Sequence, residues 1–163
     1  MASSEKLNMA LLGLGRAGKF HIQSIQSIPG INLRCVVDVD ESLAKRLAKD
    51  LECDYSTSAE GPLGQANIDA VIVASPTHEH YGQIQAALEA GKPVFTEKPL
   101  GSSLKEIDTC FGLAKRSGLP LFVGFNRRFD PSFSSLARGV KDGQVGVLQM
   151  LRVTSRDSPL PPM

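Results

Sequence analysis

Glu97 and Lys98 stand between an apolar run and a proline, in the segment Phe95–Leu100 that reads FTEKPL. A lysine in a partly dry cleft can donate a hydrogen bond to a developing alkoxide, or exchange a proton with it, as the oxidation of an alcohol requires. Glu97 could orient that ammonium or help to hold a cofactor. The alternative is a solvated charged turn, because Glu–Lys pairs are common on protein surfaces. Taken alone, the segment leaves both interpretations open.

Three glycines form a G-x-G-x-x-G motif directly after the first apolar run, in the segment LLGLGRAG. Gly13 permits a tight turn, Gly15 lets the backbone approach a pyrophosphate, and Gly18 lets a helix pack closely on a strand. The helix that starts here offers unpaired N–H groups and the positive end of its dipole to the phosphates. We therefore expect its first residues, Arg16 and Ala17, to lie against a dinucleotide together with the glycines.

An acidic residue, Asp38, lies 20 residues after Gly18, at the end of the second apolar run. A carboxylate at this position can accept hydrogen bonds from both ribose hydroxyls of a dinucleotide and would repel a 2′-phosphate. The next residues, Val39 and Asp40, offer no basic replacement. The pattern therefore predicts NAD rather than NADP, with Asp38 and Val39 in the cofactor site. The alternative is that Asp38 only caps the following helix.

A further polar junction, Ser75, Pro76 and Thr77, follows another buried run. Pro76 should end the strand and Thr77 should cap the next helix. These three residues are then expected at the rim of the site, where a nicotinamide would extend.

The sequence holds three histidines, none of which stands out as an acid or base. His78 and His80 fall in the first turn of a predicted helix, where the dipole disfavours a charged ring. A structural role is at least as well supported for them as a functional one. His21, inside the first helix, is interpreted as a packing or surface residue.

These junctions need strands and helices that alternate along the chain. Five apolar runs are expected to form buried parallel strands, namely Leu7–Leu12, Leu33–Val39, Asp69–Ala74, Pro93–Thr96 and Leu121–Phe125. Capping signals at Asp40, at Ser103 with Glu106, and at Asp130 followed by Pro131 begin helices between and after them. Right-handed βαβ units then give an α/β fold, a doubly wound parallel sheet of the Rossmann type. Ligands of such sheets bind beyond the carboxyl ends of the strands, where the polar junctions lie.

Composition narrows the class of protein. The chain has 163 residues, a net charge of +1 and no basic run, so nothing argues for nucleic acid or a membrane surface as partner. Three widely spaced cysteines without metal-ligand spacing predict reduced, mostly buried thiols and no metal site. The apolar patch near the N-terminus is too short for a secretory signal or a membrane span. We expect a soluble, cytoplasmic protein.

The motifs, in this order and at these spacings, resemble those of the glucose–fructose oxidoreductase/inositol dehydrogenase (Gfo/Idh/MocA) family. They are the glycine motif, Asp38, SPTHEH (75–80), EKP (97–99) and VGFNRRFDP (123–131). The resemblance runs from about Leu7 to Pro162, and its later part, from GFNRRFD to TSRDSPLPP, is most similar to inositol 2-dehydrogenases. It implies an NAD-dependent oxidoreductase acting on a CH–OH group of an inositol, a sugar or a related polyol.

The resemblance also implies roles for single residues. Lys98 matches the active-site lysine that hydrogen-bonds the reacting hydroxyl, and Glu97 matches its neighbour. Thr77 and His80 match a P-[NT]-x-x-H segment beside the nicotinamide. Together with the glycine motif and Asp38, these residues form the implied cofactor site.

On the substrate side, Arg127 matches an arginine that borders the substrate, and Arg156 and Asp157 match a polar segment near the pocket. The resemblance further implies two parts: an NAD-binding domain over residues 1–126, and a connecting helix with the start of a substrate domain over residues 127–163.

The family's second half carries a D-x-x-x-H helix whose histidine is the general base, and all three histidines here precede residue 81. We therefore expect a chain that binds NAD but is not competent alone, with Val145–Thr154 as the first strand of an absent sheet. The resemblance implies a homo-oligomer for the full-length form. The alternative function is a non-catalytic NAD-binding module or regulatory short form.

Overall fold

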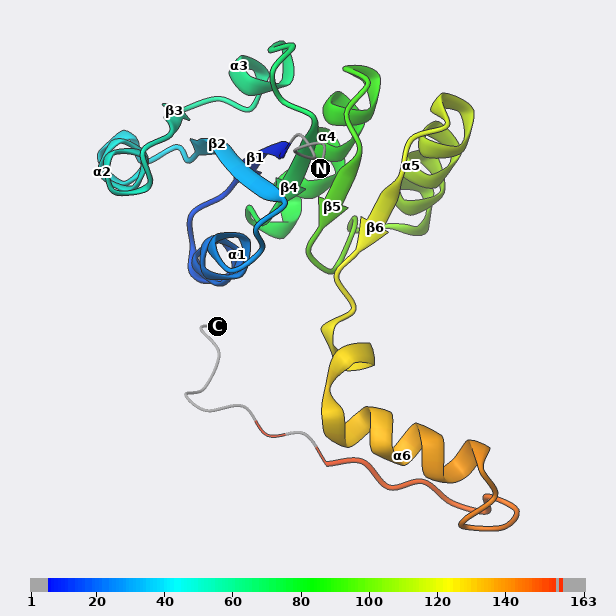
Figure 1. The fold of residues 1–163 in the computed structure, drawn as a ribbon. Helices are drawn as coiled ribbons and strands as arrows, with labels where there is room; N and C mark the ends of the chain where they lie inside the picture. The colour runs from blue at the N-terminus through cyan, green and yellow to red at the C-terminus, as the bar shows by residue number, and fades with distance from the viewer. Residues whose placement is uncertain (1–5, 155, 157–163) are drawn as a thin grey trace, which may run out of the picture. The chain divides into compact units, whose positions relative to one another are not determined.

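The computed structural model describes residues 6–154 and residue 156. Contacts within the chain divide it into two units, one that ends at Phe125 and one that begins at Asn126. The first unit holds a six-stranded sheet with helices on both faces (Figure 1). Within the described residues, no helix is long and apolar enough to cross a membrane.

Strands and helices alternate through the first unit. In chain order the elements are β1 (Leu7–Leu12), α1 (Arg16–Gln26), β2 (Ile31–Val37), α2 (Glu41–Leu51), β3 (Asp54–Ser56), α3 (Glu60–Leu63), β4 (Ala70–Val73), α4 (Thr77–Glu89), β5 (Val94–Thr96), α5 (Leu104–Ser117) and β6 (Leu121–Val123). The strand order is β3-β2-β1-β4-β5-β6, and all neighbouring strands are parallel. The predicted doubly wound sheet is confirmed. From β1 the chain adds β2 and β3 on one side and then β4, β5 and β6 on the other, so the strand order reverses between β1 and β4. Folds of this type bind their ligands at that switch point.

The two faces of the sheet build two apolar cores from alternating residues of the strands. In β1, Ala10 and Leu12 pack with buried residues of α4 and α5, whereas Met9 and Leu11 pack with those of α1 and α2. Because side chains alternate along a strand, burial on both faces requires the continuous apolar runs that the sequence shows.

Helix starts follow the predicted capping residues in three cases. The Asp40 carboxylate accepts a hydrogen bond from Leu43 N–H at 3.0 Å, and the Ser103 hydroxyl accepts one from Glu106 N–H at 3.3 Å. Asp130 accepts from the first N–H groups of the helix that follows it. Each cap supplies an acceptor to an N–H group that has no partner within its own helix.

The predicted cap at Thr77 is wrong by one residue. Pro76 is the N-cap, with φ −59° and ψ 145°, and Thr77 is the first residue of α4. The chain turns at the proline, so Thr77 already has helical geometry and no side chain caps this helix. The first N–H groups of α4 are therefore left without a side-chain acceptor.

Two short elements, β3 and α3, were not predicted. Each of the five predicted apolar runs forms a strand, with ends shifted by at most two residues. In contrast, β3 is a three-residue edge strand, DYS, with no apolar run, and α3 has only four residues. Neither carries a periodic pattern long enough to predict a secondary structure.

The second unit contains a 3-10 turn (Asn126–Phe129) and α6 (Pro131–Lys141). The strand expected over Val145–Thr154 is absent from the described structure. Val147 and Met150 are 82% and 84% exposed. A strand needs a neighbour for its N–H and C=O groups, and no described segment pairs with this one, so its β-forming sequence is not sufficient.

The cysteines are free thiols, as predicted, with Cys35 and Cys110 buried and Cys53 half-buried. Burial raises the pKa of each thiol to about 11, and nearby acidic residues add to the shift. Reactive cysteines have the opposite property, a lowered pKa. The thiols therefore belong to the packing of the sheet.

Candidate functional site

Loops at the carboxyl ends of β1, β2 and β4 enclose one cavity of about 200 Å³. It is lined by Leu12, Gly13, Val37, Asp38, Val39, Ser75, Pro76, His78, Glu79 and Gln83. Five of the predicted cofactor residues are thus brought together across the switch point of the sheet, although they come from three separate loops. His78, Glu79 and Gln83, the three residues of α4 in this lining, were not predicted as cofactor residues. The helix begins beside the cavity, and nothing in the sequence indicates that its polar face would line a site.

The other predicted cofactor residues lie outside this lining. They are Gly15, Arg16, Ala17, Gly18, Thr77, His80, Glu97 and Lys98. Four of them form the end of the glycine loop and the start of α1, two lie in the first turns of α4, and Glu97 and Lys98 lie in the loop after β5.

Gly13 and Gly18 are required by the fold itself. Gly13 has φ +92°, and a Cβ atom there would lie 2.5 Å from the Cα atom of Ser75. A Cβ atom on Gly18 would lie 2.1 Å from the carbonyl oxygen of Gly13. These distances are too short for any side chain, so the two glycines let the β1 loop approach both the β4 loop and α1.

Gly15 differs, because a Cβ atom built on it meets no protein atom within 4 Å. It is the N-cap of α1, no side chain caps the helix, and its first turn contains no acidic residue. The N–H groups at this end are therefore open to an anion, as a pyrophosphate-binding helix needs. The space beside Gly15 fits a ligand rather than a protein neighbour.

Replacing Gly15 by alanine is expected to weaken NAD binding about tenfold, because the methyl group would displace a phosphate from the backbone N–H groups. Folding stability should change by less than about 1 kcal/mol, since the site is open and φ is −68°. Calorimetric titration with NAD and urea unfolding measure the two effects. Gly30→Ala, at another open position, is the matched control. Equal NAD affinity in the Gly15 variant would contradict the assignment.

The Asp38 carboxylate accepts hydrogen bonds from two backbone N–H groups, one in the glycine loop and one at the start of α2. Oδ2 accepts from Leu14 N–H at 2.8 Å, and Oδ1 accepts from Asp40 N–H at 3.0 Å. Asp40, not Asp38, caps α2. The carboxylate is thus held at the mouth of the cavity, which supports the ribose role over the alternative of a helix cap.

Replacing Asp38 by alanine is expected to lower NAD affinity about tenfold or more and to reduce the preference for NAD over NADP. The carboxylate would no longer accept from the ribose hydroxyls or repel a 2′-phosphate. Titrations with both dinucleotides give the two affinities. Asp54→Ala removes an exposed carboxylate from the adjacent strand β3 and should change neither. An unaltered preference in the Asp38 variant would remove the basis for NAD selectivity.

His80 joins the loop after β4 to the loop after β5. The side chain is buried, with Nε2 at 2.8 Å from the carbonyl oxygen of Ser75 and Nδ1 at 2.6 Å from that of Pro99. The Ser75 hydroxyl donates to Gln83 Oε1 at 2.8 Å. Both loops are therefore fixed relative to α4, and His80 has a structural role whether or not it also borders a cofactor.

Lys98 is exposed at the carboxyl end of β5, and the Lys98–Pro99 peptide bond is cis. None of the hydrogen bonds or ion pairs among the described residues involves its ammonium. Glu97 forms no hydrogen bond with it, and Glu97 Oε1 lies instead 2.9 Å from Nε2 of His21. The ammonium is therefore available to a ligand. The sequence could have placed His21 near the sheet, because it lies three residues after Gly18, on the face of α1 that packs there.

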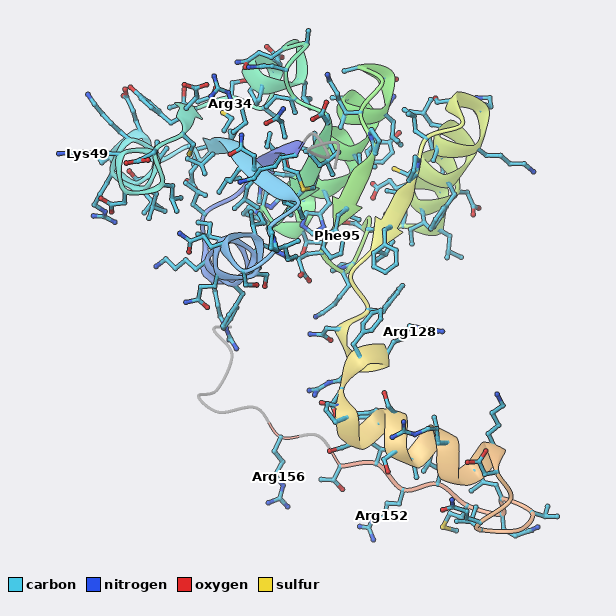
Figure 2. All side chains as sticks on the ribbon, in the orientation of Figure 1. Arg34, Lys49, Phe95, Arg128, Arg152 and Arg156 are labelled. Carbon is cyan, nitrogen blue, oxygen red and sulfur yellow. The ribbon has the colours of Figure 1, made fainter. Side chains whose placement is uncertain are left out.

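Of the substrate residues, Arg127 is described within the second unit. Its guanidinium lies 3.4 Å from Asp130 Oδ2 and 5.4 Å from the centre of the Phe133 ring. Arg156 is exposed, and Asp157 lies outside the described residues (Figure 2). Arg127 thus has a fixed orientation relative to α6.

Comparison with known proteins places the chain in one family of oxidoreductases. The model of the oxidoreductase family with an NAD-binding Rossmann fold, Gfo/Idh/MocA, matches residues 7–125. The chain is 38% identical to the uncharacterized oxidoreductase YrbE of Bacillus subtilis over 160 residues, which are 98% of this chain and 47% of YrbE. It is 34% identical to inositol 2-dehydrogenase of Rhizobium meliloti, over 96% of this chain and 47% of that protein.

A solved structure supports the same relationship. Scyllo-inositol dehydrogenase from Lactobacillus casei, with bound cofactor NAD(H) and scyllo-inositol, superimposes with a TM-score of 0.82 and 32% sequence identity. The match covers 87% of this chain and 43% of that one. The chain therefore spans somewhat less than half the length of the relatives it matches.

Proposed function

Because this chain belongs to the Gfo/Idh/MocA oxidoreductase family and has its NAD-binding Rossmann fold, we propose that it forms part of a polyol dehydrogenase. In this proposal it binds NAD and presents Lys98 to a CH–OH group of an inositol, a sugar or a related polyol. One observation carries the proposal: a lysine ammonium that pairs with none of the described residues stands at the carboxyl end of β5, beside the strand whose loop lines the cavity.

The described residues fit NAD. The open start of α1 would hold the pyrophosphate, Asp38 the ribose hydroxyls, and the loop Ser75–Thr77 the nicotinamide end. NAD, when bound, supplies the acceptor for the hydride that leaves the substrate carbon. Lys98 would donate a hydrogen bond to the substrate oxygen and stabilise negative charge as it develops there.

In this proposal the proton acceptor comes from outside the described residues. Of the three histidines, His21 faces Glu97, His80 is buried between two carbonyl groups, and His78 lies on the surface 3.3 Å from Glu79. No hydrogen bond among the described residues joins a histidine ring to Lys98. We therefore propose that this chain alone binds NAD without turnover. The same observation favours the second candidate function, an NAD-binding module without catalysis.

A chimera separates the two candidates. This chain would replace the part of the Lactobacillus casei scyllo-inositol dehydrogenase that it matches, and NADH formation would be followed with scyllo-inositol and myo-inositol. The dehydrogenase proposal predicts NADH from the chimera, and NAD binding without NADH from the chain alone. A chimera that binds NAD but forms no NADH from any polyol would contradict the catalytic proposal and favour the binding module.

Several implications of the resemblance and of the composition stay predictions. They are the division into residues 1–126 and 127–163, the substrate role of Arg127 and Asp157, a homo-oligomeric full-length form, and a cytoplasmic location.

A further inference from the structure

His21 connects the helix at the proposed pyrophosphate site to the loop that carries Lys98. It lies in the second turn of α1, the helix that starts directly after the glycine loop. Its Nε2 atom is 2.9 Å from Oε1 of Glu97, the residue immediately before Lys98. One contact therefore spans two parts of the proposed site that are 76 residues apart in the sequence.

The ring of His21 is fixed by aromatic packing. It meets the ring of Phe95 edge-on, with centroids 5.3 Å apart and an interplanar angle of 71°, and Phe95 stacks on Phe122 at 5.5 Å. Phe95 lies on the side of the sheet that packs with α1 (Figure 2). The side chains of His21 and Glu97 are 18% and 26% exposed. A hydrogen bond to a carboxylate in such a partly desolvated place is stronger than one in water.

The backbone on either side of Lys98 is held as well. Glu97 N–H donates to the carbonyl oxygen of Val73 at 2.8 Å, and the carbonyl oxygen of Pro99 meets the His80 ring. Residues 97–99 are thus tied to β4 and α4 through the backbone, and among the described residues the hydrogen bond that ties them to α1 is that of the Glu97 side chain. The contact with His21 is the connection that relates Lys98 to the cofactor-binding helix.

We propose that His21 is a positioning residue for Lys98: through Glu97 it sets the place of the ammonium relative to NAD held at the start of α1. This inference rests on the proposed function. One rigid helix, α1, would then fix the position of Lys98, which stabilises the substrate oxygen, relative to the bound hydride acceptor. Such a device is useful because small displacements of a catalytic group cost a large part of the rate.

Two substitutions separate the hydrogen bond from the aromatic packing. His21→Phe retains a ring against Phe95 and removes the nitrogen that faces Glu97, whereas His21→Gln removes the ring and supplies an N–H donor at similar reach. The readout is the rate at which acetic anhydride acetylates Lys98, located by peptide mass spectrometry with and without saturating NAD. Exposed lysines of α2, Lys45 and Lys49, are the internal standards.

In the parent chain, NAD is expected to slow acetylation of Lys98 about tenfold relative to the standards. His21→Phe should reduce this protection to about twofold at saturating NAD, and His21→Gln should restore most of it. A residue with only a structural role would lower thermal stability and leave the protection at saturating NAD unchanged. Gln23→Phe, at an exposed position of the same helix, is the matched control and should behave as the parent.

The outcomes distinguish this inference from the proposed function. If NAD protects Lys98 equally in the parent and in His21→Phe, the positioning role is wrong and the proposed function is unaffected. If NAD does not bind the parent, the proposed function is wrong and this inference with it; if NAD binds but does not protect Lys98, the positioning role is wrong and the proposed function is unaffected. Should His21→Phe not fold, Glu97→Gln weakens the same hydrogen bond from the other side, and undiminished protection in that variant would overturn the inference.

Discussion

Lys98→Met is expected to lower polyol-dependent NADH formation by the chimera about 10²–10⁴-fold, the usual contribution of a group that handles the reacting proton or oxygen. Methionine retains the length and apolar stem of lysine and removes the donor. NAD affinity should stay within about twofold, because the Lys98 ammonium contacts no residue of the described cavity. Progress curves at saturating NAD and scyllo-inositol give the rate, and calorimetry gives the affinity.

The control for this substitution is Lys105→Met, which removes an exposed ammonium from the first turn of α5. It should leave both the rate and the affinity unchanged. A Lys98 variant with the parent rate would exclude Lys98 from the chemistry. A loss of rate fully explained by a loss of NAD affinity would assign Lys98 to cofactor binding alone.

Gly13→Ala is expected to destabilise the first unit by about 3 kcal/mol, which combines a strained positive φ with a severe overlap. The added Cβ atom would lie 2.5 Å from both the Cα and N atoms of Ser75. Since these are backbone atoms at the end of β4, no side-chain rotation can relieve the overlap. The β1 and β4 loops must separate, and this opens the cavity and lowers NAD affinity as well. Urea unfolding and NAD titration measure the two losses.

Gly91→Ala isolates the contribution of backbone strain. Gly91 also has a positive φ, +75°, but a Cβ atom there meets nothing within 4 Å. This variant should lose only about 1–2 kcal/mol, and its NAD affinity should equal that of the parent. Equal destabilisation by the two substitutions would show that the close approach of Gly13 to Ser75 contributes nothing.

The features that the sequence predicted well are governed by local rules. Gly13, Gly15 and Gly18 could be placed because a strand–turn–helix with this glycine spacing has few alternatives. Asp38 could be placed because it ends a buried run beside them. The structure adds a distinction that spacing cannot provide: two of these glycines are required by protein packing, and Gly15 alone faces open space.

The features that the sequence did not predict depend on tertiary contacts. The partner of Glu97 is His21, which lies in another helix, and neither residue type indicates that pairing. The short edge strand β3 forms on β2 without an apolar run of its own. Conversely, Val145–Thr154 has a strand-like composition but no neighbouring strand within the described residues, so the expected strand is not formed.

The most direct test of the proposed site is a titration of the isotope-labelled chain with NAD, followed by backbone amide chemical shifts. The largest changes are expected at Gly15, Asp38, Ser75 and Lys98, which would place one dinucleotide from the start of α1 to the loop after β5. Changes confined to the amino ends of β1 and β4, at the separate cavity lined by Lys6, Leu7, Asn8, Ala66, Asn67 and Asp69, would contradict this assignment.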